Sequence, residues 1–105
     1  MKPKLIRDNI PQIIEETGST CTVSYVNNIK ERIRWLREKI IEETEEFISD
    51  PTYSEAADMI EVVKALCYLN GLEWEVVLST AINKEDTHGG FYSGVILETV
   101  NYKMD

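Results

Sequence analysis

The chain is poor in cysteine, histidine, glycine and proline, and these shortages exclude several classes of protein. Its 105 residues include 2 cysteines, 1 histidine, 5 glycines and 3 prolines. Cys21 and Cys67 are too few for a disulfide scaffold and lack the spacing of a metal site. The chain has no internal repeat and no linker rich in proline or glycine, so we expect one domain over residues 1–105.

Basic residues are also scarce, with 11 Lys and Arg against 19 Asp and Glu and a formal net charge of −8. Because Lys and Arg supply most of the affinity for a phosphate backbone, we expect no nucleic-acid partner. No apolar run approaches the roughly 20 residues of a membrane-spanning helix, so we expect no membrane partner. Charged residues at the N-terminal end, including Arg7 and Asp8, precede any apolar stretch of a signal peptide. A cytoplasmic location is expected.

The hydrophobic pattern predicts a mainly α-helical fold with a small β element. A short helix is expected at residues 9–17, with Pro11 in its first turn. We expect Asn27 or Asn28 to cap a long helix that runs to residue 49, and Asp50-Pro51 separates it from a second one over residues 54–70. The pair Asn70-Gly71 is suited to end this second helix in a left-handed conformation. A further helix is expected at residues 73–86. Residues 20–26 and 91–100 are typical of strands, which could pair with each other.

Each of the two long helices carries a pair of acidic residues three positions apart. Glu43 and Glu46 flank the apolar stripe of the first helix, whereas Glu55 lies inside the apolar arc of the second and Asp58 at its edge. A carboxylate on an apolar face is unfavourable unless it is paired or bound to a metal. Because the break between the helices is short, we expect an antiparallel hairpin with both pairs near its loop end.

Four converging carboxylates form a site with oxygen ligands only, which suits Mg²⁺, or Mn²⁺, rather than Zn²⁺. Mg²⁺ often shares its coordination sphere with substrate phosphates, so the pattern favours metal-assisted phosphoryl transfer to water. Two alternatives stay open. The glutamate-rich run can be a solvated helix face, and Glu55 can be an acid of the first helical turn favoured by the helix dipole.

The order of these acids resembles the signature of a known family. Glu42-Glu43-x-x-Glu46 followed by Glu55-x-x-Asp58 is similar to the motif of the all-α nucleoside triphosphate pyrophosphohydrolases, the MazG-like group that includes phosphoribosyl-ATP pyrophosphohydrolase. Three further stretches resemble a subgroup like the latter enzyme: residues 4–11 (KLIRDNIP), 61–66 (EVVKAL) and 89–91 (GGF). The resemblance covers nearly the whole chain.

This resemblance implies a Mg²⁺-dependent hydrolase that cuts a nucleoside triphosphate between its α and β phosphates. The products implied are a nucleoside monophosphate and pyrophosphate, in a house-cleaning role. The metal ligands implied are Glu43, Glu46, Glu55 and Asp58. Glu42 and Glu43 are the implied catalytic acids, and Glu42 would orient or deprotonate the attacking water. A homodimer or homotetramer is also implied, which agrees with a second helix too apolar for a lone hairpin to cover.

Four residues are candidates for binding the substrate's phosphates. Lys4 and Arg7 have suitable side chains, the alternative being an N-terminal segment docked by ion pairs alone. Asn83 and Lys84 are the nearest such residues before the GGF run, because the chain lacks the basic residues that the subgroup tends to carry there. Two other functions stay open: phosphoribosyl-ATP hydrolysis in histidine synthesis, and a non-catalytic helical dimer that senses a nucleotide or cation.

Overall fold

The computed structural model describes residues 2–104, which form four helices and, within that range, no strand. The helices are α1 (Ile10–Glu16), α2 (Ile29–Ser49), α3 (Tyr53–Leu69) and α4 (Trp74–His88). The prediction of a mainly helical chain is therefore confirmed. The chain divides into two units, one ending at Trp74 and the other beginning at Glu75, and we describe each by itself. The prediction of one domain stays a prediction.

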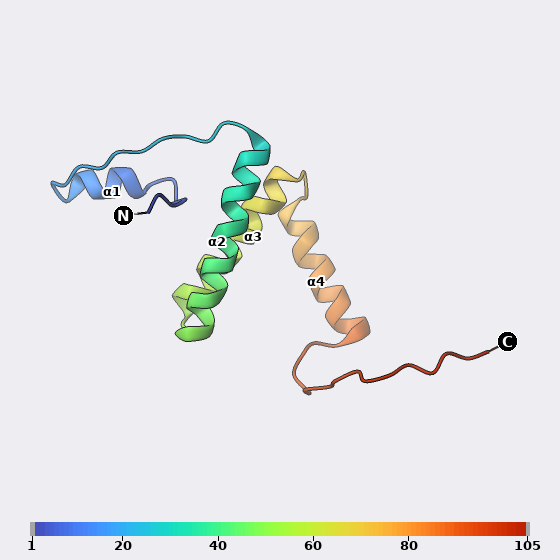
Figure 1. Ribbon diagram of the computed structural model, residues 1–105. Helices are drawn as coiled ribbons and strands as arrows, with labels where there is room; N and C mark the ends of the chain where they lie inside the picture. Colours follow the sequence, from blue (N-terminus) through green and yellow to red (C-terminus); the bar gives the residue numbers. More distant parts are fainter. Residues whose placement is uncertain (1, 105) are drawn as a thin grey trace. The chain divides into compact units, whose positions relative to one another are not determined.

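Helices α2 and α3 pack against each other as a hairpin (Figure 1). Side chains cap both helices at their N-termini: Asn28 Oδ1 accepts from the backbone N–H of Glu31 at 3.2 Å, and Thr52 Oγ1 accepts from that of Glu55 at 3.1 Å. Pro51 lies in the short link between the helices, where it interrupts no helical hydrogen bond. The hairpin therefore follows from the local signals around residues 50–52.

The apolar core of the described residues is small. Its buried apolar side chains are Leu36, Val62 and Cys67. The apolar stripe expected along α2 is buried only near its middle, because Ile33 and Phe47 are half-buried and Ile29 is exposed. A hairpin alone cannot cover a stripe that runs the length of a helix, so apolar surface remains exposed on this unit.

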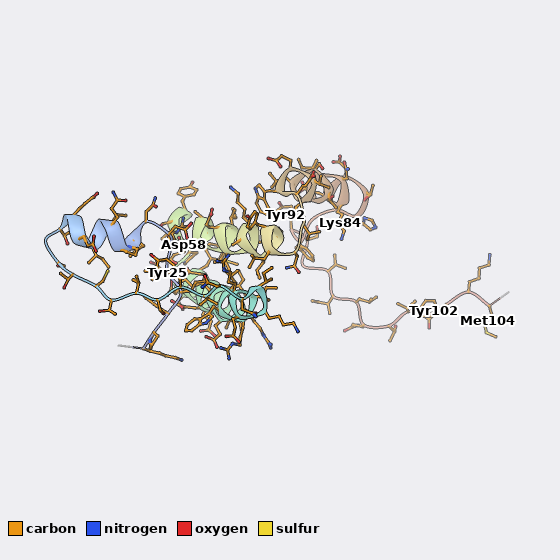
Figure 2. All side chains as sticks on the ribbon, turned by 90° about the horizontal axis from the view of Figure 1, so that it is seen from above. Tyr25, Asp58, Lys84, Tyr92, Tyr102 and Met104 are labelled. Atoms are coloured by element: carbon orange, nitrogen blue, oxygen red, sulfur yellow. The ribbon has the colours of Figure 1, made fainter. Side chains whose placement is uncertain are left out.

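The end of α3 follows the predicted pattern. Gly71 has a φ of +71°, the left-handed conformation that glycine adopts without a steric penalty, and the N–H of Leu72 donates to the Cys67 carbonyl at 2.9 Å. In the second unit, α4 is followed by an extended segment that includes Tyr102 and Met104 (Figure 2). Among the described residues, no helix has the length and apolarity needed to cross a membrane.

The small β element is not confirmed. Residues 20–26 and 91–100 have no regular secondary structure, and neither segment forms a strand. Their β-branched and aromatic residues favour an extended backbone, but a strand needs the hydrogen bonds of a neighbouring strand. Tyr25, Val95 and Ile96 accordingly stay exposed. The predicted strands at these positions stay a prediction.

Candidate metal-binding site

Glu43 is the one buried charged residue in the part of the chain that the structure describes, with 5% of its surface exposed. It follows Leu36 by seven residues on α2, which places the two on nearly the same face of the helix. Its Oε1 lies 3.3 Å from Lys39 Nζ, whereas no described residue offers a hydrogen bond to its buried Oε2. A buried carboxylate oxygen with no partner is a large electrostatic cost, and a bound cation would remove it.

The first turns of α3 supply two more carboxylates. Glu55 is half-buried, and its Oε2 is also buried without a hydrogen-bond partner among the described residues. Asp58 follows one turn later, is half-buried, and accepts a hydrogen bond at its Oδ1 from Arg7 Nη2 at 2.6 Å. Because the Thr52 cap fixes the start of α3, it also fixes the positions from which these acids project.

The acids of the two helices come together in space. Two groups, Glu42 with Glu43 and Glu46, and Glu43 with Glu55 and Asp58, each bring one oxygen per residue to within 4.8 Å of the others. Glu43 belongs to both groups and joins them. We name Glu42, Glu43, Glu46, Glu55 and Asp58 the acidic cluster. The structure thus brings together the acids that the sequence analysis selected, while their roles in binding and catalysis stay predictions.

Burial and neighbouring charges change how readily Glu43 and Glu46 ionise. Burial raises the pKa of Glu43, against the lowering effect of Lys39, and the charges of Glu46 and Asp58 raise it further. Desolvation and the neighbouring charges of Glu55 and Glu42 raise the pKa of Glu46. Neighbouring carboxylates therefore oppose the ionisation of Glu43 and Glu46, and a divalent cation would relieve this repulsion.

An open depression of about 370 Å³ adjoins the cluster. It is lined by Glu42, Glu46 and Glu55 of the cluster and by Glu45, Ser49 and Asp50. Glu45 is exposed and lines this depression. With five carboxyl groups in its lining, the depression would repel phosphate unless cations were bound there.

Two basic side chains already contact the cluster. Lys39 Nζ lies 3.3 Å from Glu43 and 3.6 Å from Glu42. Lys39 is not among the predicted site residues, although its position four residues before Glu43 on a helix could have indicated the pair. Arg7 contacts Asp58, which matches the alternative of an N-terminal segment docked by an ion pair. Its predicted contact with phosphate stays a prediction.

The other predicted substrate-binding residues are exposed. Lys4 is exposed and precedes the half-buried Leu5 and Ile6. Asn83 and Lys84 are exposed on α4 in the second unit, where Figure 2 labels Lys84. All three side chains are accessible to solvent, and their contact with substrate stays a prediction.

The donor set of the cluster fits a hard divalent cation. It consists of carboxylate oxygens without histidine or cysteine, the ligand type that Mg²⁺ and Mn²⁺ prefer. Five carboxylates outnumber the two basic side chains that contact them, and two carboxylate oxygens lie buried without partners. Both the chemistry and the charge of the site thus favour a cation.

Comparisons with protein-family models, curated proteins and solved structures found no match. The resemblance to the MazG-like family therefore depends on the motifs quoted above.

Proposed function

We propose that the protein is a Mg²⁺-dependent nucleotide pyrophosphohydrolase of the MazG-like type. The observation that supports this most strongly is the buried Oε2 of Glu43, which lacks a partner at the point where acids from α2 and α3 meet. The substrate class is a nucleoside triphosphate or a related nucleotide, cut between the α and β phosphates. Mn²⁺ is an alternative cation of the same chemistry.

Four residues of the cluster would hold the cation: Glu43, Glu46, Glu55 and Asp58. When bound, the cation supplies positive charge for the phosphate oxygens and makes an attacking water more acidic. Glu43 joins the two helices in this task, because it is the member common to both groups of acids. Because α2 and α3 pack against each other, the hairpin would hold the four side chains close together before substrate arrives, which would lower the reorganisation needed for reaction.

Glu42 is the proposed general base, with Glu43 contributing through the bound cation. Its side chain is 40% exposed and lines the open depression, so water and substrate can reach it. Lys39 lies 3.6 Å from its Oε1 and restrains the carboxylate. A base in this position would orient the attacking water and accept its proton.

An assay of turnover by the purified protein tests this proposal. The protein is incubated with Mg²⁺ and a panel of standard and modified triphosphates, and the pyrophosphate and nucleoside monophosphate formed are measured. We expect Glu46→Ala to reduce turnover by about 100-fold or more, because loss of a metal ligand costs at least as much as loss of its supporting residues. Glu45→Ala is the matched control, since Glu45 is the neighbouring acid and also lines the depression. Equal turnover of both variants, with circular dichroism unchanged, would contradict the assigned ligands.

A non-catalytic sensor is the second candidate, favoured by the basic partners that the acids already have. Arg7 contacts Asp58, and Lys39 contacts Glu43. These ion pairs neutralise part of the negative charge of the cluster without a bound metal ion. Mg²⁺-dependent nucleotide binding without product formation, on a panel that includes phosphoribosyl-ATP, would support the sensor. Turnover of phosphoribosyl-ATP alone would instead identify the biosynthetic enzyme.

We further propose that a second copy of the chain, in a dimer or tetramer, covers the exposed apolar surface of the hairpin. Ile48 on α2 and Ile60 on α3 are 73% and 55% exposed. Three buried apolar side chains among the described residues are few for a unit of this length to be stable alone. Association between copies would bury this surface.

A further inference from the structure

The ion pair between Arg7 and Asp58 joins two parts of the first unit that are 51 residues apart in sequence. Arg7 belongs to residues 2–8, which precede α1, have no regular secondary structure and are named here the N-terminal segment. Asp58 lies on α3 and is one of the proposed cation ligands. One carboxylate is therefore contacted by a basic side chain and is also proposed to bind a cation.

We propose that Arg7 is an internal counter-cation that the divalent ion displaces from Asp58, so that cation binding loosens the attachment of the N-terminal segment. This inference rests on the proposed function, because it needs a cation at the acidic cluster. The divalent ion and the Arg7 guanidinium are both positive, so they repel each other near the Asp58 carboxylate. The divalent ion has the larger charge of the two. Displacement would also leave the Arg7 guanidinium free to contact a phosphate oxygen of the substrate.

The exposure of the pair makes such an exchange energetically feasible. The side chains of Arg7 and Asp58 are 54% and 32% exposed, and ion pairs in contact with water are weak. A cation that also contacts the buried oxygens of Glu43 and Glu55 gains interactions that Arg7 does not make with either. The exchange therefore favours the cation once its concentration is sufficient.

Binding of Mn²⁺, followed by electron paramagnetic resonance of the free ion, tests the proposal. We expect Arg7→Gln to bind Mn²⁺ about two- to five-fold more tightly than wild type, the range that corresponds to loss of an exposed ion pair. The matched control is Arg34→Gln, because Arg34 makes an ion pair of the same 2.6 Å length with Glu31. Arg34 precedes Glu43 by about 13 Å along α2, which exceeds the screening length of about 8 Å at physiological salt.

Tryptic cleavage of the Lys4–Leu5 bond, followed by mass spectrometry, gives a second measurement. We expect Mn²⁺ to accelerate cleavage in wild type, whereas Arg7→Gln is cleaved rapidly with or without the ion. Unchanged or weaker Mn²⁺ binding by Arg7→Gln would overturn the displacement and leave the proposed hydrolase intact. Absence of saturable Mn²⁺ binding by wild type would overturn the cation site itself, and the displacement with it.

Discussion

Glu43 is the residue at which burial and charge conflict most strongly. It lies on the apolar side of α2, yet its pKa is raised rather than lowered despite the contact with Lys39. The folded chain thus stabilises the protonated form of Glu43 relative to the unfolded chain. Since a metal ligand must be ionised, folding and cation binding make opposite demands on this side chain.

We expect Glu43→Gln to stabilise the metal-free protein at pH 7 by about 1 kcal/mol, because it removes a buried charge with an unpartnered oxygen. The contribution of Glu43 to stability is complete below its unfolded pKa of about 4.5, and it is lost as the pH rises through the higher folded value. Urea denaturation at several pH values measures the free energy of unfolding. This free energy should therefore change less with pH for Glu43→Gln than for wild type.

Addition of Mg²⁺ should stabilise wild type and have little effect on Glu43→Gln, because the ion binds the ionised carboxylate. Glu45→Gln is the control, since Glu45 is exposed on the same helix. If Glu43→Gln is less stable than wild type at pH 7 without metal, the ionised carboxylate of Glu43 does not destabilise the metal-free protein, and this prediction is wrong.

At the scale of the elements, the four helices could be predicted because their signals are local. Asn28 caps α2 and Gly71 ends α3 as expected, and α3 begins at Tyr53, one residue before the predicted start near Ser54. The proximity of the acids could also be predicted, because helical periodicity fixes which residues share a face of a helix. The Arg7 contact could not be predicted in this way, because residues 2–8 have no period that relates them to α3.

The N-cap of α3 gives a prediction at this scale. We expect Thr52→Ala to lower the free energy of unfolding by about 1 kcal/mol, because the Glu55 N–H loses its acceptor. The same change at Thr22, which is exposed in an irregular segment, should alter stability by less than about 0.5 kcal/mol. Urea denaturation measures both, and equal losses in the two variants would argue against the cap.

At the scale of the whole molecule, the exposed apolar surface and the small core favour association. We expect analytical ultracentrifugation to give the mass of two or four chains of 12.1 kDa. Ile60→Lys should shift the distribution toward the monomer, because it places a charge on the apolar surface of α3. Glu61→Lys, a change at the next and exposed residue, should leave the mass unchanged. A monomer of wild type at micromolar concentration would exclude the proposed assembly.

The short link over residues 50–52 has a consequence for the order of folding. All acids of the cluster lie between residues 42 and 58, on the two arms that this link connects. A short loop closes quickly, so α2 and α3 can meet before distant parts of the chain arrive. We expect repulsion among the carboxylates to oppose this early step, whereas Arg7, 51 residues from Asp58 in sequence, should contribute later.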